Sequence, residues 1–233
     1  MEEHIVLFMD FLGFKNAVAN WKSQQISSLI QQLNGLANNQ SQFGINSRTN
    51  GNSTNVTISS NITTFSDHIV ASYPYKPNNL PEGMDQNAWE DMVLQHMQKI
   101  AAHFTIMGLD LGLLARGGLS RGDLYHNGRV VMGKAMIDAY ELESKVAQYP
   151  RIAVANNITN SNRIYPDIDD KNCLEYFTEM MIALGNNAQQ QGQTYISDID
   201  NTITKLKQNM QYKKAANWCY FRENLKNAVA TWP

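Results

Sequence analysis

The chain has 233 residues, of which 43% are hydrophobic, so it is long enough to bury a core. Its 19 Lys and Arg against 21 Asp and Glu give a net charge of −2, which argues against a protein that coats nucleic acid, because neutralising phosphates needs surplus cations. No apolar run reaches the roughly 18 residues of a membrane span, and the start MEEHIVLF lacks the positive charges of a secretion signal. Cys173 and Cys219 form no metal or redox motif. We therefore expect a cytoplasmic protein with no membrane span and no nucleic-acid partner.

The first third of the chain predicts a strand, a helix and a strand pair. Residues 4–9 form an apolar run, and an amphipathic stretch follows from Lys15 to about Leu36. Residues 37–61 are mostly Asn, Ser, Thr, Gln and Gly, which predicts a surface excursion too polar to pack. The apolar segment 62–73 then predicts two strands that turn at Ser66 and Asp67.

The middle of the chain predicts a long helix and a second strand pair. Apolar residues between Trp89 and Met107 recur at helical spacing. Segment 113–133 predicts two strands around the turn signal Asn127-Gly128. A helix over 134–148 and a strand over 151–155 follow.

Helical patterns dominate beyond about residue 168 and end in an aromatic and basic tail over 212–224. The predicted order is β-α-β-β-α-β-β-α-β followed by helices, which is typical of an α/β sandwich. We expect a single domain over 1–233, with a core of about 4–155 and a helical C-terminal extension of about 168–233.

Two aspartates are candidates for chemistry. Asp10 ends a buried strand and precedes a glycine turn and a helix start, whose free N–H groups suit a phosphate. Asp67 lies in an apolar strand pair, where a charge is costly unless it is paired or bound to a metal. Two carboxylates at the ends of neighbouring strands suit two divalent ions ~3.5–4 Å apart. Each aspartate alone also fits a strand-end cap or a turn, and the local pattern leaves both readings open.

Three segments, in this order, resemble the catalytic domain of class III nucleotidyl cyclases: VLFMDFLGF, TTFSDHIVAS and RGGLSRGDLYHNGRVVMGKAMIDAYELES. The resemblance covers about residues 4–155 and implies a ferredoxin-like βαββαβ core with an added hairpin and C-terminal helices. It implies that Asp10 and Asp67 bind two Mn²⁺ or Mg²⁺ ions, with the Phe11 carbonyl as a further metal ligand.

The same resemblance extends to the substrate and to a partner subunit. It implies that the turn formed by Phe11, Leu12, Gly13 and Phe14 holds the triphosphate. Members of the family work as head-to-tail dimers, in which one subunit supplies the metals and the other grips the base and ribose. The resemblance therefore implies a homodimer with sites at the interface.

The residues with which purine cyclases select their base are absent. Four residues before Asp67 the chain has Thr63, where those enzymes have Lys or Glu, and Gly133 is followed by Lys134 in place of Asp or Cys. The family's ribose Asn and triphosphate Arg correspond to Ile137 and Glu141, so both roles are missing or moved.

A second resemblance points to pyrimidine chemistry. The segments MDFLGF, RGGLSRGDLYH, GKAMIDAYELE, YPRIAV and YKKAANWCYFREN look like the pyrimidine cyclases of bacterial Pycsar antiphage systems. This implies conversion of UTP to 3′,5′-cyclic UMP and pyrophosphate, or of CTP to cyclic CMP, and a separate effector activated by the product. The alternative is a catalytically silent cyclase fold that binds nucleotide or dimerises. The missing Asn and Arg favour that alternative, and the retention of two adjacent carboxylates opposes it.

Several cations compete for the role of the missing Arg. Arg116 and Arg121 lie on opposite faces of a regular strand, because their spacing is odd. Arg121, expected near the strand end, is the catalytic candidate, and Arg116, Thr63 and Lys134 are candidates for nucleotide binding. Each Arg also fits a surface or interface ion pair, and Lys134 also fits a solvated helix start.

Two further groups of residues fit either a functional or a structural role. His68 neighbours Asp67, but strand alternation turns it away, which favours a packed or hydrogen-bonded histidine. Lys213 and Lys214, with Trp218 and Tyr220, either fold over the site or belong to an ordinary packing helix.

Overall fold

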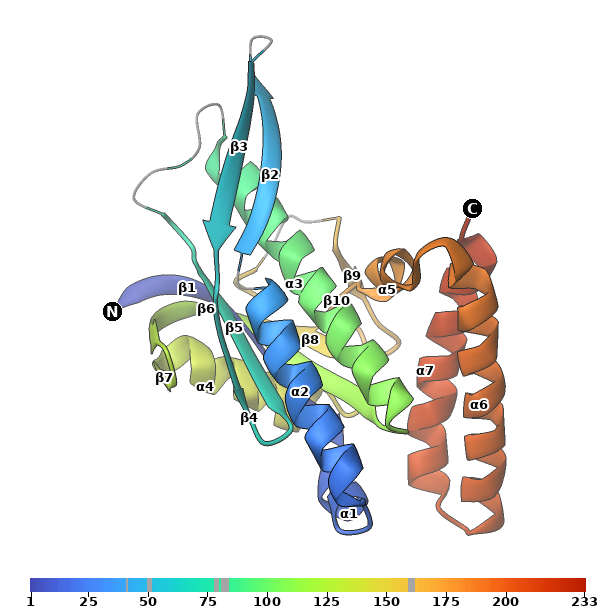
Figure 1. Cartoon of the computed structure of the whole chain (residues 1–233). Coiled ribbons are helices and arrows are strands. Elements are labelled where there is room, and N and C mark those ends of the chain that lie inside the picture. Colours follow the sequence, from blue (N-terminus) through green and yellow to red (C-terminus); the bar gives the residue numbers. More distant parts are fainter. Residues whose placement is uncertain (41, 50–51, 78–79, 81–83, 159–161) are drawn as a thin grey trace.

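A mixed β-sheet forms the centre of the molecule, and helices pack on both of its faces (Figure 1). The computed structural model describes residues 1–233 apart from 41, 50–51, 78–79, 81–83 and 159–161. Along the main path of the sheet the strands are, in order, β4 (Asn61–Phe65), β5 (His68–Pro74), β1 (Glu2–Leu12), β6 (Leu114–Asn127), β8 (Ile152–Val154), β10 (Asn172–Leu174) and β9 (Ile164–Pro166). The short strand β7 (Val130–Met132) pairs with β6 beside this path.

The helices cover the sheet and build the C-terminal part of the molecule. In chain order they are α1 (Phe14–Val18), α2 (Ser23–Gln40), α3 (Gln86–Asp110), α4 (Lys134–Glu141) with a π-helical turn (Leu142–Val146), α5 (Phe177–Leu184) with a 3₁₀ turn (Gly185–Asn187), α6 (Ala188–Gln208) and α7 (Tyr212–Thr231). None of the helices in the described part of the chain is long and apolar enough to cross a membrane.

The N-terminal part of the chain forms the predicted βαββαβ unit. In chain order it consists of strand β1, the helical segment α1–α2, strands β4 and β5, helix α3 and strand β6, with a further strand pair over residues 42–59 inserted before β4. The strand order is β6-β1-β5-β4. Strand β1 is antiparallel to both of its neighbours, β5 and β6. This arrangement confirms the ferredoxin-like expectation and the mixed α/β class.

Strand β1 divides its side chains between two hydrophobic clusters, one on each face of the sheet. The larger cluster, on the side of α3, includes Ile5, Leu7, Met9 and Phe11. The smaller cluster, on the side of α4, includes Val6 and Phe8. The apolar run at the N-terminus therefore has a structural cause, because both faces of this strand are covered.

The C-terminal helices share the larger cluster rather than forming a core of their own. Ile196 and Ile203 of α6 and Phe221 and Leu225 of α7 belong to it together with the residues of α3. Helices α6 and α7 run side by side at one edge of the molecule (Figure 1).

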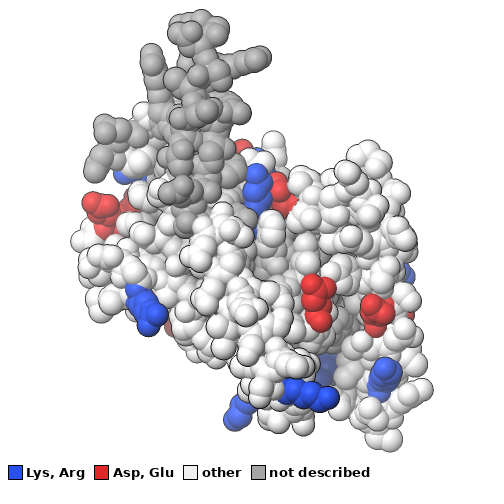
Figure 2. All heavy atoms as spheres, in the orientation of Figure 1, with Lys and Arg blue, Asp and Glu red and all other residues white. Residues whose placement is uncertain are grey.

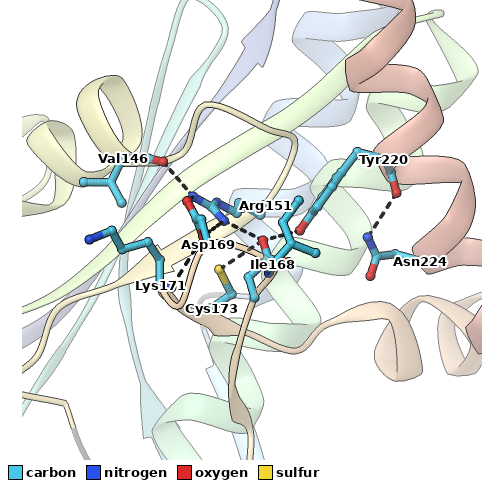
Figure 3. Close-up of polar contacts among 9 residues, drawn as sticks. Val146, Arg151, Ile168, Asp169, Lys171, Cys173, Tyr220 and Asn224 are labelled. Atoms are coloured by element: carbon cyan, nitrogen blue, oxygen red, sulfur yellow. Dashed lines mark hydrogen bonds and ion pairs between the residues drawn. The ribbon is translucent and has the colours of Figure 1, made fainter.

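A buried arginine ties α7 to the sheet region (Figure 3). Arg151 is 2% exposed, and its guanidinium donates to Asp167 at 2.5 Å and to both carboxylate oxygens of Asp169 at 2.6 Å. The Tyr220 hydroxyl of α7 donates to Asp167 at 2.6 Å, and its ring stacks on Tyr149 at 5.0 Å. This set, called the Arg151 cluster below, bridges three segments that are distant in sequence.

The main elements predicted from the sequence are confirmed. The long helix α3, the strand pair that turns at Ser66 and Asp67 and the strand pair around Asn127-Gly128 all form. The predicted helix from Lys15 to Leu36 is two helices instead. Asn20, whose side chain donates to the Asn16 carbonyl, lies at the break between them.

The polar segment 37–61 differs most from the prediction. Helix α2 continues to Gln40, and strands β2 (Gln42–Thr49) and β3 (Asn52–Ser59) pair antiparallel and project from the main sheet (Figure 1). The projecting position agrees with the predicted surface excursion, but the sequence analysis did not predict the two strands. Residues 41 and 50–51 of this segment lie outside the described residues.

The sheet also extends further than predicted. Strands β9 and β10 lie at its far edge, in a region where we expected mainly helices. Each has only three residues, which is too short for a periodic pattern to be visible in the sequence.

Candidate functional site

Asp10 and Asp67, 57 residues apart in the sequence, meet in space together with His68. One potential ligand atom from each of the three side chains lies within 4.8 Å of the other two. Asp10 comes from the end of β1, and Asp67 comes from the turn between β4 and β5. Strand β5 pairs with β1, and this pairing brings the turn next to Asp10.

The β4–β5 turn explains the position of His68. Phe65 and His68 are paired across the hairpin, so Ser66 and Asp67 form a two-residue turn, in which Ser66 has φ 54 in the left-handed region. The alternation argument does not apply, because Asp67 is a turn residue rather than a strand residue. His68 Nδ1 lies 3.2 Å from Asp67 Oδ1, so the expectation that His68 points away from Asp67 was wrong.

Aromatic rings on both sides hold the His68 imidazole. The ring of Phe65 stacks on it at 4.9 Å, and the ring of Phe8 lies at 5.2 Å. Its Nδ1 is also 3.3 Å from the Phe65 carbonyl oxygen. His68 is therefore packed, as expected, but next to Asp67.

Arg116 and Glu143 complete the charged group. Arg116 lies opposite Asp10 in the β1–β6 register, and its Nε donates to Asp10 Oδ1 at 3.2 Å. The other end of the guanidinium contacts the Glu143 carboxylate, which lies in the π-helical turn and is 2% exposed. Burial, and then the nearby Asp10 carboxylate, raise the pKa of Glu143 to about 7, although Arg116 acts in the opposite direction.

Two glycines of β6 let this arrangement pack. A Cβ on Gly118 would lie 2.0 Å from the Ala139 carbonyl oxygen of α4. A Cβ on Gly117 would lie 2.6 Å from the Phe8 carbonyl oxygen of β1. The sequence RGG therefore supplies Arg116 and allows α4, with the turn that carries Glu143, to approach the sheet closely.

The donor set fits a divalent cation. Asp10 and Glu143 share the Arg116 guanidinium, and Asp67 lies beside Asp10, so negative charge is in excess when the three carboxylates are ionised. Carboxylate oxygens suit Mg²⁺ and Mn²⁺, and the His68 imidazole adds a nitrogen ligand that suits a transition metal better than Mg²⁺.

The turn that follows Asp10 lies at the start of α1. Gly13 has φ 84, a conformation that favours glycine, and its carbonyl accepts from the N–H groups of Asn16 and Ala17. The side chain of Phe11 is buried and stacks on Phe104 at 4.1 Å. The phosphate role of this turn, Phe14 included, and the metal role of the Phe11 carbonyl stay predictions.

Arg121 lies away from this group within the chain. It sits in the middle of β6 rather than at the strand end, opposite Ile5, and on the other face of the sheet from Arg116. Its guanidinium lies 4.2 Å from the Tyr75 ring and its Nε 3.2 Å from Glu3. The expectation that Arg121 is near the strand end was wrong, and Arg116 is the arginine that the fold brings to Asp10.

Thr63 and Lys134 also have partners of their own. The Thr63 hydroxyl is buried, lies 2.8 Å from His126 Nε2 and donates to the Gly128 carbonyl at 2.5 Å. Lys134, at the exposed start of α4, donates to Asp138 at 2.6 Å. The nucleotide roles of both residues stay predictions.

The two positions that correspond to the family's Asn and Arg face outward. Ile137 is 59% exposed on α4. Glu141 accepts from Lys145 at 2.7 Å in an exposed pair. Neither side chain takes part in the contacts around Asp10.

Glu143 is the site residue that the sequence reasoning missed. It lies near the end of the third segment that resembles the cyclases, RGGLSRGDLYHNGRVVMGKAMIDAYELES, ten residues after Gly133 and four after Ala139. The signal was therefore present, but an acidic residue on a polar helix is too common to be singled out by itself.

No family model and no curated protein matches the chain. The comparison with solved structures found similar proteins. The guanylate cyclase domain of RhGC from Catenaria anguillulae, in complex with GTP, is similar with a TM-score of 0.45 and 12% identity, over 74% of this chain and 93% of that one. A bacterial light-regulated adenylyl cyclase has a TM-score of 0.44 and 13% identity, over 78% and 96%. A class III adenylyl cyclase-like ATP-binding protein from Pseudomonas aeruginosa has a TM-score of 0.43 and 14% identity, over 79% and 40%. At such identities and TM-scores the likeness does not establish a family for this chain.

Proposed function

We propose that this protein is a nucleotide cyclase that converts UTP to 3′,5′-cyclic UMP and pyrophosphate, with CTP and cyclic CMP as the alternative pair. The convergence of Asp10 and Asp67 carries the proposal. The two residues were singled out from separate motifs, and they meet across paired strands. The order of those motifs supports a cyclase, and the absence of the purine-selecting residues supports a pyrimidine base.

In this proposal the charged group holds the reacting end of the nucleotide. Asp10 and Asp67 hold the divalent ions, and Arg116 orients the Asp10 carboxylate through its hydrogen bond. Glu143 holds the other end of the Arg116 guanidinium. Two divalent ions bound there would lower the pKa of the ribose 3′-hydroxyl and neutralise the departing pyrophosphate. The Phe11–Phe14 turn then lies where it can bind the phosphates.

We further propose a homodimer in which a second copy completes each site. The family resemblance implies that the partner subunit grips the base and ribose, and Arg121 lies on the face of the sheet opposite Asp10 and Arg116 of the same chain. Apolar side chains stand exposed beside the site on β7 and α4, which favours a second protein surface there. They include Val130, Met132, Ile137 and Tyr140, each at least half exposed.

The resemblance to pyrimidine cyclases also suggests a biological setting. We propose that the cyclic nucleotide is a second messenger in antiphage defence and acts on a separate effector protein in the cytoplasm.

The decisive experiment incubates the purified protein with Mn²⁺ or Mg²⁺ and with each of the four ribonucleoside triphosphates, and resolves the products by mass. We expect cyclic UMP, or cyclic CMP, with Mn²⁺ or Mg²⁺ and no product after chelation. Cyclic AMP or cyclic GMP as the main product would overturn the pyrimidine assignment. Binding of nucleotide without any product would support the silent alternative, which the outward-facing Ile137 and Glu141 favour.

A further inference from the structure

A cavity of about 790 Å³ lies between the end of β1 and the α6–α7 hairpin. One wall includes Leu12 and Gly13, from the turn that follows Asp10, and the opposite wall includes Lys213, Lys214 and Trp218 from α7. Among the residues that the structure describes, no Asp or Glu lines this cavity, although the chain as a whole has a net charge of −2. Figure 2 shows basic side chains at the end of the molecule where α1 and the α6–α7 turn lie. The cavity is therefore suited to an anion.

The cations that the sequence placed near the nucleotide are already paired. Arg116 contacts Asp10 and Glu143, Arg121 contacts Glu3, and Lys134 contacts Asp138. Transfer of a phosphoryl or nucleotidyl group needs positive charge on the phosphates, which Arg, Lys and metal ions supply. Positive charge on the outer phosphates beyond that of the metal ions therefore requires a cation other than these three.

Lys213 and Lys214 meet that requirement. Both are exposed, and within the described part of the chain neither forms a salt bridge with a carboxylate. They lie in the first turn of α7, which contains no acidic residue. Positive charge in a first turn opposes the helix dipole, so these lysines do not serve the stability of the helix.

The cavity is close enough to the Asp10 site to share one ligand with it. Leu12 and Gly13 are two and three residues beyond Asp10, which corresponds to roughly 7–10 Å along an extended chain. A nucleotide with its α-phosphate near Asp10 and Asp67 would direct its outer phosphates past this turn. The Trp218 ring and the leucine side chains of the walls lower the local dielectric, which strengthens attraction between lysine and phosphate.

We propose that the cavity binds the polyphosphate chain of the nucleoside triphosphate and that Lys213 and Lys214 are its cationic ligands. The inference rests on the proposed function in so far as the nucleotide is the cyclase substrate. In this proposal the α6–α7 hairpin is part of the binding site. This corresponds to the interpretation of the aromatic and basic tail as a segment that folds over the site.

Calorimetry measures how tightly the protein of residues 1–233 binds inorganic tripolyphosphate in the absence of divalent metal. The variant Lys213→Gln/Lys214→Gln is compared with Lys205→Gln/Lys207→Gln, which removes the same charge from the same hairpin outside the cavity. We expect the first variant to bind tripolyphosphate at least about tenfold more weakly, because two charge-assisted hydrogen bonds are lost, and the control to change by less than about twofold. Equal affinity of wild type and both variants would overturn the proposal.

Steady-state kinetics separates this proposal from the proposed function. If the wild type forms cyclic product, the first variant should show a raised KM for the nucleotide and weaker inhibition by pyrophosphate, and the control should show neither. Unchanged KM and unchanged pyrophosphate inhibition would overturn the lysine site and leave the cyclase assignment standing. Lysine-dependent tripolyphosphate binding in a protein that cyclises no nucleotide would retain the site and overturn the function.

Discussion

The Asp10 site and the Arg151 cluster contain the same residue types but differ in how completely their hydrogen bonds are satisfied. Both combine an arginine with aspartates on neighbouring elements. In the Arg151 cluster, Asp167 accepts from Arg151, from the Tyr220 hydroxyl and from the Ile168 N–H. In the Asp10 site, Asp10 accepts one hydrogen bond from Arg116 at 3.2 Å, and Asp67 has His68 beside it.

The difference shows how a structural ion pair can be told from a site for chemistry. Carboxylates that accept several hydrogen bonds beside a buried guanidinium have less capacity left for a ligand, so they connect elements of the fold. Carboxylates that keep open lone pairs, beside a further acid whose pKa is raised, carry an unfavourable arrangement that a cation would relieve. The predictions below test this contrast, from the largest expected effect to the smallest.

The substitutions Asp10→Asn and Asp67→Asn should each reduce product formation by more than about 100-fold, because each removes a metal ligand, and loss of an outer-shell partner alone already costs 10–100-fold. Stability should change much less than on breaking a fully buried ion pair, because loss of one carboxylate charge reduces the repulsion among Asp10, Asp67 and Glu143. Product assays and urea unfolding measure the two effects. Asp198→Asn, on the exposed face of α6, is the control. Product formation near the wild-type rate in either variant would contradict the metal assignment.

The substitution Arg151→Met should show the opposite pattern. It leaves the buried Asp167 carboxylate without its cation, which typically costs about 3–5 kcal/mol. Urea unfolding should show this loss, and the rate per folded molecule should stay near wild type. Arg222→Met, which removes an arginine from an exposed pair with Asp200, should cost less than about 1 kcal/mol. A stable Arg151→Met protein without activity would place the Arg151 cluster in the site instead.

The stability of the fold should fall in acid because of two buried histidines. Burial first, and then nearby basic groups, lower the pKa of His96 and of His126 to about 4 from 6.5. Between these pH values the unfolded chain binds more protons than the folded chain, so the free energy of unfolding falls as the pH falls from 6.5 toward 4. Each histidine accounts for at most about 3 kcal/mol. Urea unfolding across this range measures it.

Two variants test whether His126 contributes to this loss of stability in acid. His126→Gln removes one titrating group and should remove about half of the decrease. His103→Gln, on the exposed side of α3, should leave most of it, because His103 is the last of the causes that lower the pKa of His96. Equal decreases in the wild type and in His126→Gln would show that His126 does not contribute.

The smallest expected effect concerns Thr63. The substitution Thr63→Val removes the hydroxyl that bonds the Gly128 carbonyl and His126, which should cost about 1–3 kcal/mol of stability. The ratio of UTP to CTP turnover should stay unchanged, because the hydroxyl is already used within the chain. The less buried Thr64 provides the control Thr64→Val. A changed ratio in Thr63→Val would establish instead the base contact that the resemblance implies.

Much of the fold could be predicted because its signals are local. The helical spacing of apolar residues predicts α3, the turn residues Asn127-Gly128 predict the β6–β7 hairpin, and the apolar run before Asp10 predicts β1. Each of these signals lies within one element, where backbone periodicity alone decides which side chains share a face.

The sequence by itself identified the two aspartates as candidates and predicted the class of the fold. Only the tertiary structure decided which cation meets Asp10, because the β1–β6 register selects Arg116 over Arg121 across more than a hundred residues. It also decided that His68 lies beside Asp67, since a two-residue turn removes the alternation of a strand. Finally, it brought Lys213 and Lys214 to the turn at Gly13, because a helical hairpin takes its position from the shared hydrophobic core and not from its own sequence pattern.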